Sequence, residues 1–166
     1  DRINLALGIV SSQAAGLQVQ EGTTAHFLEL GFPCRAGVEA AMLVRNGARA
    51  RADIIEFPGG FCSVLVGAEN CDYEEMIKGL GKSFVILAPE IHIKKYPCCF
   101  ANHMALDGFL SLLEEQKIHH EDVENVEVGV NEYIARWLRH PDPKTGDEAK
   151  FSLQHTLGTA MSKGKV

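Results

Sequence analysis

The clearest pattern in the chain is an amphipathic repeat in its second half. Leu106, Phe109, Leu110 and Leu113 follow one another at i, i+3, i+4 and i+7, with polar and acidic residues between them. This spacing places the apolar side chains on one face of a helix. Asn102 precedes the repeat, and its residue type is favoured as an N-cap. The pattern therefore predicts a helix that begins just after Asn102.

Helical patterns also dominate the first half. A stretch rich in Ala, Leu and Gln predicts a closely packed helix, and a second helix ends at Asn46-Gly47, a typical stop. Gly31-Phe32-Pro33 predicts a turn before that second helix, because Gly and Pro interrupt regular structure. The expected helices cover residues 3–18, 35–46, 73–79 and 148–161.

Three segments instead have the character of strands. Residues 84–87 and 91–93 are short apolar runs, and Val126, Val128 and Val130 alternate with other residues as in a half-buried strand. The expected fold class is therefore α+β. We expect an α-rich layer over residues 1–93, joined near Lys94 to a small α/β layer over residues 94–166.

Composition narrows the class of protein. The chain has 166 residues and a net charge of −6, which does not suggest a nucleic-acid partner. Its most apolar run, residues 3–17, is interrupted by Gly, Ser and Gln, so no membrane span is expected. Five cysteines, an odd number, favour a reduced, intracellular protein. Because the chain opens on Asp1 and not on Met, we expect it to be part of a longer protein.

The densest group of reactive residues runs from Lys94 to His103. Two ammonium groups, Lys94 and Lys95, stand shortly before a helix N-terminus, where free N–H groups and the helix dipole favour an anion. His103 falls in the first helical turn, where the dipole favours a neutral imidazole able to exchange protons. The pattern is also compatible with a solvated lysine pair and with cysteines that only pack.

Other chemistries have less support. Cys98 and Cys99 are adjacent, which does not match zinc-ligand spacing, and a nucleophilic pair of Cys99 with His103 lacks an orienting third group. His26 and His155, taken singly, are typical of satisfied or exposed histidines. No nucleotide-binding glycine motif is present. We therefore expect neither a metal nor an organic cofactor.

Four stretches together resemble the MmgE/PrpD family, which includes 2-methylcitrate dehydratase, cis-aconitate decarboxylase and iminodisuccinate epimerase. The most specific is Lys94 to Asp107, which is similar to the family's "KxYPCCxxTHxAIDA". The other three are residues 7–17, similar to "ALGIAGSQASGL"; residues 22–43, similar to "GTMTKPLHAG…NGVLAALLA"; and residues 148–154, similar to "EAKFSLQY".

The resemblance implies a helical domain with a smaller α/β lid, a polycarboxylate site between them, and a homodimer formed through the helical domain. It implies no cofactor, and a reaction in which a proton or a carboxylate leaves next to a carboxylate-stabilised carbanion. Lys94, His103, His26 and His155 are then the candidate catalytic residues. The candidate substrate-binding residues are Lys94, Lys95, Cys99 and Thr23.

Three positions depart from the family pattern. Cys99 stands where the decarboxylases have histidine, His26 where the family has an active-site lysine, and His155 where it has an active-site tyrosine. We expect a part of a lyase, dehydratase or isomerase that acts on a small di- or tricarboxylate, inactive as the 166-residue chain alone. The alternative is a non-catalytic remnant that binds a carboxylate or a partner. The expected compartment is the cytoplasm, or the mitochondrial matrix in a eukaryote.

Overall fold

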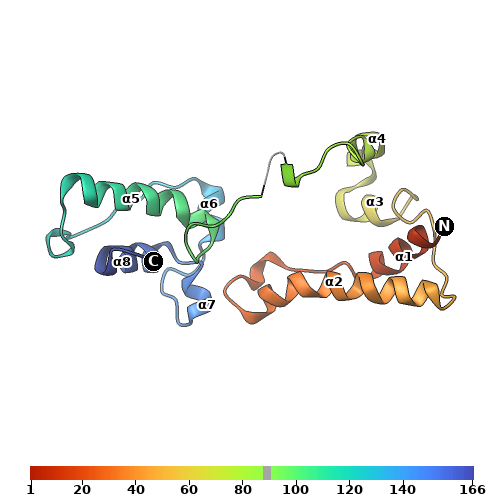
Figure 1. Cartoon of the computed structure of the whole chain (residues 1–166), viewed down its shortest axis with the longest axis horizontal. Coiled ribbons are helices and arrows are strands. Elements are labelled where there is room, and N and C mark those ends of the chain that lie inside the picture. Colours follow the sequence, from red (N-terminus) through yellow and green to blue (C-terminus); the bar gives the residue numbers. More distant parts are fainter. Residues whose placement is uncertain (88–90) are drawn as a thin grey trace. The chain divides into compact units, whose positions relative to one another are not determined.

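The computed structural model describes residues 1–87 and 91–166, and the regular structure within them is entirely helical (Figure 1). No strand or sheet occurs in this part of the chain, so the prediction of an α/β lid is wrong. The α-helices are α1 (Arg2–Val10), α2 (Thr24–Arg45), α3 (Phe61–Val66), α4 (Tyr73–Ile77), α5 (His103–Gln116), α6 (Glu132–Trp137), α7 (Gly146–Ala149) and α8 (Leu153–Lys163).

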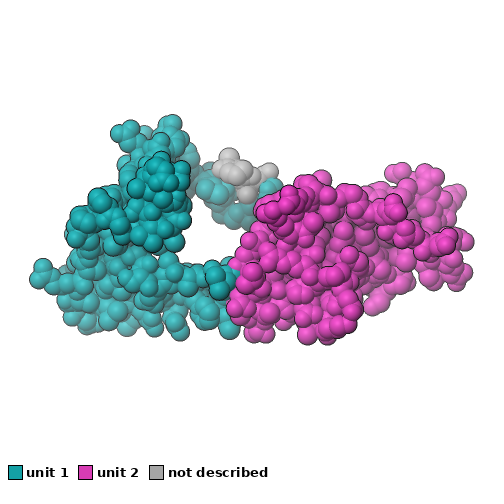
Figure 2. Space-filling view, turned by 180° about the vertical axis from the view of Figure 1, so that it is seen from behind, with its two compact units in different colours: residues 1–17, 27–92 teal, residues 18–26, 93–166 magenta. Residues whose placement is uncertain are grey.

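The chain forms two compact units, coloured separately in Figure 2. Unit 1 consists of Asp1–Leu17 and Phe27–His92. Unit 2 consists of Ile93–Val166 together with the short segment Gln18–His26 from the first half of the sequence. Thr23 and His26 therefore belong to the same unit as Lys94, His103 and His155.

In unit 1, α1 lies alongside α2 (Figure 1). The buried face of α2 carries Ala36, Ala40 and Val44, spaced four residues apart. Gly8 on α1 is buried, and a Cβ there would lie 2.4 Å from the carbonyl oxygen of Arg51. The small Gly8 therefore allows α1 to approach the backbone of the segment after α2 closely, in line with the closely packed helix predicted there.

Helix α2 runs without a break through Pro33, so the predicted turn at residues 31–33 is wrong. A proline inside a helix removes one backbone hydrogen bond and costs about 3 kcal/mol, and α2 nonetheless continues beyond it to Arg45. The expected stop is confirmed, because α2 ends at Arg45 and Gly47 follows at φ 92°. None of the helices in the described residues is both long and apolar enough to cross a membrane.

In unit 2, α5 packs against α8 around a small core. Leu106 is fully buried at its centre, as the amphipathic repeat predicts. Phe109 and Leu110 are partly buried against it. The other buried members of this core are Tyr96, Cys98, Leu157 and Ala160.

The single helix expected over residues 148–161 is two helices, α7 and α8. Between them Ser152 caps α8, because its Oγ accepts a hydrogen bond of 3.1 Å from the N–H of His155. Ser152 is fully buried, so this break is part of the packed interior.

The alternating valines of residues 126–130 form no strand, and neither do residues 84–87 and 91–93. Val126 and Val128 instead line a hollow with Phe109 of α5 and Leu157 of α8. All three valines are 37–40% exposed, so the half-buried strand predicted from the alternation is not seen. The alternation alone does not supply the neighbouring strand that a sheet needs.

Candidate active site

The loop before α5 is built from buried residues at alternate positions. Tyr96 and Cys98 are both less than a tenth exposed, and Pro97 between them is exposed. A 3₁₀ turn, η5 (Phe100–Asn102), then leads directly into α5. His103 is therefore the first residue of α5, close to the position predicted from sequence.

Asn102 ties this loop to the segment before α8. Its Nδ2 donates to the carbonyl oxygen of Lys150 over 3.2 Å, and its Oδ1 accepts from the Thr156 hydroxyl over 3.3 Å. The backbone N–H of Cys99 donates to the same Lys150 carbonyl over 2.8 Å. Asn102 stands at the N-cap position, but its side chain makes no capping hydrogen bond, so that part of the prediction is wrong. The amide is fully buried and is used between helices instead.

His103 is 6% exposed and is enclosed by two aromatic rings. Tyr96 meets the imidazole edge-on, with ring centroids 5.2 Å apart, and Phe100 lies tilted against it at 4.9 Å. The Nε2 atom is buried and has no hydrogen-bond partner within the described residues. A buried polar atom of this kind is uncommon, and it is available to a ligand or a water molecule.

Lys95 and Tyr96 both donate to one carboxylate oxygen. The Oδ1 atom of Asp107 accepts from Lys95 Nζ at 2.5 Å and from the Tyr96 hydroxyl at 2.7 Å. The hydrogen bond to Asp107 raises the pKa of Lys95, and the bonds from Lys95 and Tyr96 lower the pKa of Asp107. Burial, followed by the hydrogen bond to Asp107, raises the pKa of Tyr96. Lys95, which the sequence predicts to bind substrate, thus forms its ion pair with Asp107.

Lys94 is exposed and forms no ion pair with any residue that the structure describes. Burial raises the pKa of the Cys98 thiol, and the positive charge of Lys94 partly opposes this rise. Cys99 is half-buried and its thiol is free. Residues 1–87 and 91–166 contain no cluster of His, Cys, Asp and Glu suited to a metal ion.

The segment Gln18–His26 is held in unit 2 by residues after α6. His140 Nε2 lies 3.0 Å from the carbonyl oxygen of Glu21, and the buried Glu21 carboxylate faces Arg139 Nε at 3.8 Å. The Thr23 hydroxyl donates to the Gln20 carbonyl over 2.7 Å, so its proton is used within the turn.

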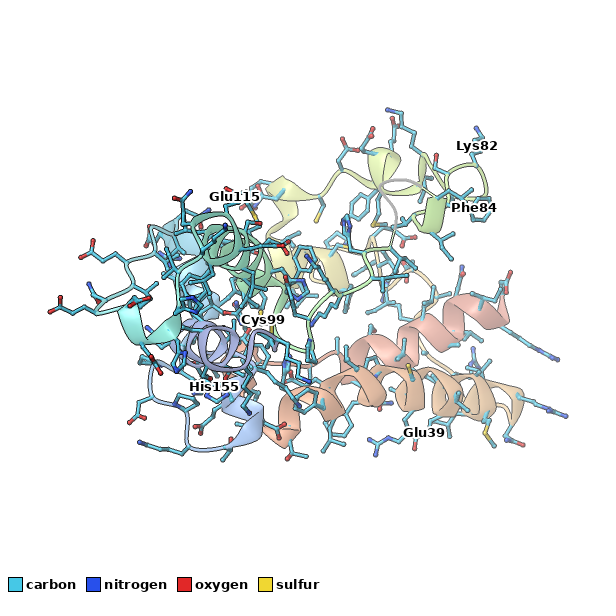
Figure 3. The ribbon with its side chains drawn as sticks, turned by 60° about the vertical axis from the view of Figure 1, so that its left-hand side comes forward. Glu39, Lys82, Phe84, Cys99, Glu115 and His155 are labelled. Carbon is cyan, nitrogen blue, oxygen red and sulfur yellow. The ribbon has the colours of Figure 1, made fainter. Side chains whose placement is uncertain are left out.

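The other two candidate histidines, His26 and His155, contact side chains within residues 151–159. The ring of His26 meets Phe151 edge-on, with centroids 5.4 Å apart. His155, labelled in Figure 3, is exposed on the first turn of α8, and its Nε2 lies 3.5 Å from the Thr159 hydroxyl on the same helix. His26 therefore contacts the chain just before α8, the helix that carries His155. Helix α8 is joined to the His103 loop by the hydrogen bond between Thr156 and Asn102.

Sequence reasoning missed Asp107 and Asn102 as members of this arrangement. Asp107 stands four residues after His103, on the same face of α5, so helical spacing offered a signal for it. For Asn102 the sequence indicated only a role as the N-cap of the helix.

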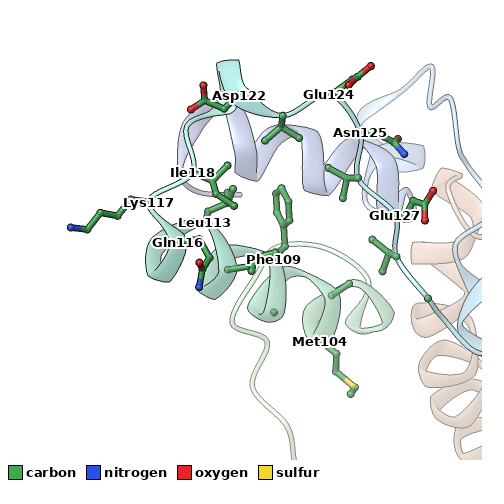
Figure 4. A pocket seen from close by; sticks show the side chains of 17 residues that line it. Met104, Phe109, Leu113, Gln116, Lys117, Ile118, Asp122, Glu124, Asn125 and Glu127 are labelled. Atoms are coloured by element: carbon green, nitrogen blue, oxygen red, sulfur yellow. The ribbon is translucent and has the colours of Figure 1, made fainter.

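A separate hollow of unit 2 lies away from these residues. About 870 Å³ in volume, it opens between α5 and the chain after it, and Phe109 projects toward it (Figure 4). Met104, Gly108 and Leu112 line it from α5, and His103 and Asp107 do not. No predicted site residue lines this hollow.

The fold and the site define a helical protein with a buried imidazole at a helix N-terminus and an uncommitted lysine ammonium in the preceding loop. Comparison with known families gives the class a name. Residues 1–74 match the MmgE/PrpD N-terminal domain, and residues 96–166 match the MmgE/PrpD C-terminal domain. The chain belongs to the MmgE/PrpD family. A search of curated protein sequences found no match.

Proposed function

We propose that this chain contributes to a lyase, dehydratase or isomerase acting on a small di- or tricarboxylate. The observation that carries the proposal is His103, a buried imidazole at the N-terminus of α5 whose Nε2 has no partner in the described part of the chain. Family membership supports chemistry of the dehydratase or lyase type.

Each residue has a distinct part in this proposal. The Lys94 ammonium binds a substrate carboxylate, because a cation and the positive end of a helix both favour an anion. His103 takes a proton from the carbon next to a carboxylate, and that carboxylate stabilises the carbanion. If the carbanion pair forms a C=C bond and the hydroxide on the next carbon leaves as water with the proton held by His103, the reaction is a dehydration. If His103 returns the proton to the other face of the carbanion, the reaction is an isomerisation. His26 and His155 line the substrate-binding site in this proposal.

The test uses full-length parent protein assayed with methylcitrate, cis-aconitate and iminodisuccinate. We expect Lys94→Ala to raise KM, and His103→Gln to lower kcat by about a hundredfold or more, the usual range for general acid–base catalysis. Lys82→Ala is the matched control, since Lys82 is an exposed lysine of unit 1 (Figure 3). Unchanged kcat and KM in Lys94→Ala would show that Lys94 does not bind substrate.

A second candidate is a non-catalytic protein that binds a carboxylate. His26 and His155 favour it, because they replace a lysine and a tyrosine of the family pattern. Neutral histidine is a poorer permanent cation than lysine. Calorimetric titration of the 166-residue chain with citrate separates the candidates: heat of binding without turnover supports this one, and turnover by the chain alone excludes it.

We further propose that the protein forms a homodimer through unit 1, in the cytoplasm or, in a eukaryote, the mitochondrial matrix. Val38 and Met42 are exposed one turn apart on α2, and apolar surface of this kind favours association. Five free cysteines favour a reducing compartment. In sedimentation velocity we expect a dimer that Val38→Glu weakens. A monomer at high concentration would contradict the dimer.

A further inference from the structure

Resting on the proposed role of His103, we propose that Asp107 is a positioning residue that orients the His103 imidazole through the ring of Tyr96. Asp107 does not touch the imidazole in this scheme. It fixes the hydroxyl of Tyr96, and the Tyr96 ring in turn fixes the plane of His103.

The geometry supports each step. The Tyr96 hydroxyl donates to Asp107 Oδ1 over 2.7 Å, which fixes the far end of the ring. The same ring meets His103 edge-on, with an interplanar angle of 75°. A tyrosine held at its hydroxyl and buried along its ring can present only one edge or face to the imidazole, so the contact is specific in direction.

Lys95 holds the carboxylate in place. Its Nζ donates to the same Oδ1 atom over 2.5 Å and lies 5.1 Å from the centre of the Tyr96 ring. Two donors on one oxygen leave the carboxylate little freedom to rotate away from Tyr96. This assigns Lys95 a use within the protein in place of the substrate contact predicted from sequence.

The spacing along α5 explains why Asp107 suits this task. His103 and Asp107 are four residues apart, so they share one face of the helix. From this position the Asp107 carboxylate accepts hydrogen bonds from Lys95 and Tyr96, which lower its pKa and keep it charged. Asp107 thus acts on the orientation of the ring.

The arrangement is complete over a broad pH range. The pKa of Asp107 is lowered from 3.8, so its contribution is present above that value and is lost as pH falls through the folded pKa. The pKa of Lys95 is raised from 10.5, so its contribution is present below that value and is lost as pH rises through the folded pKa. Measurements near neutral pH therefore report the intact network.

The test is the NMR signature of the His103 ring in the 166-residue chain, assigned by the loss of its signals in His103→Gln. We expect Asp107→Ala and Tyr96→Phe both to shift the His103 Hδ2 and Hε1 resonances. Tyr96→Phe retains the packed ring, so it keeps the test valid if Asp107→Ala unfolds. Glu114→Ala, an acidic residue also on α5, is the matched control and leaves these resonances in place.

The outcomes separate this inference from the proposed function. Unchanged His103 resonances in both variants would overturn the positioning role, whether or not the protein binds a carboxylate. Resonances that shift in the variants but do not respond to citrate support the positioning role and contradict the proposed function. In an active parent protein, Asp107→Ala is expected to lower kcat about tenfold with little change in KM.

Discussion

Replacing Asn102 by Asp distinguishes two roles for one residue. As an N-cap, Asn and Asp are nearly equivalent, so the substitution would leave the free energy of unfolding almost unchanged. As a buried bridge, Asn102 must donate from Nδ2 to the Lys150 carbonyl, and a carboxylate cannot donate. The structure shows the second role, and we expect a clear loss of stability.

The magnitude follows from burial. Loss of one intramolecular hydrogen bond costs about 1 kcal/mol. A carboxyl group at a site that is 0% exposed resists ionisation, and each unit by which its pKa then exceeds the unfolded value costs about 1.4 kcal/mol at neutral pH. With a rise of one to two units, the expected destabilisation is about 2 to 4 kcal/mol.

The pH dependence has a definite sign. Because the folded pKa of the introduced carboxyl is raised, the ionisation penalty is absent below its unfolded pKa and grows as pH rises toward the folded value. Asn102→Asp should therefore be less destabilising at about pH 4 than at about pH 7.

Urea unfolding followed by Trp137 fluorescence measures this directly. Trp137 is the single tryptophan and lies on α6 in unit 2. Asn131→Asp is the matched control, because the exposed Asn131 side chain does cap α6, accepting from the Ile134 N–H over 2.8 Å. We expect the control to stay within about 0.5 kcal/mol of the natural protein. Equal midpoints for the two variants would refute the bridging role.

Three further predictions concern packing and thiol chemistry. Leu106→Ala should lower the free energy of unfolding by about 2 to 5 kcal/mol in the same urea assay, since the side chain is fully buried, and a loss below about 1 kcal/mol would contradict its central position. Gly22→Ala should lower the melting temperature, because its φ is 84° and the new Cβ would lie 2.5 Å from His140 Nε2; an unchanged melt would mean that this contact is absent. Cys98 should react with a disulfide reagent far more slowly than the exposed Cys34, since burial raises the pKa of its thiol, and comparable labelling of the two by peptide mapping would refute this.

The parts of the fold that follow from local sequence were predictable. The apolar repeat placed the start of α5 to within a residue, and its Leu106 is the largest fully buried side chain. The helix end predicted at Asn46-Gly47 is also confirmed, because Gly adopts a positive φ at little cost. Each of these features depends on neighbours within a turn or two of the chain.

Helix α2 continues through Pro33, which the turn signal at residues 31–33 does not reveal. Features that depend on distant partners were not predictable in the same way. Val126 and Val128 line a hollow with residues of α5 and α8 and form no strand, although the same alternation would suit one. Likewise His103 could be singled out from sequence. Its contact with the Tyr96 ring, and the hydrogen bond from Tyr96 to Asp107, depend on the tertiary structure.

The short segment Gln18–His26 shows why the candidate site is not the property of one half of the sequence. It falls within the region that matches the family's N-terminal domain, yet it packs in unit 2 with the region that matches the C-terminal domain. Glu21 and His26 make their contacts there, with His140 and Phe151. A chain cut between the two matched regions would separate these partners. The contacts that Glu21 and His26 make in unit 2 therefore require both regions in one polypeptide or in a complex that reunites them.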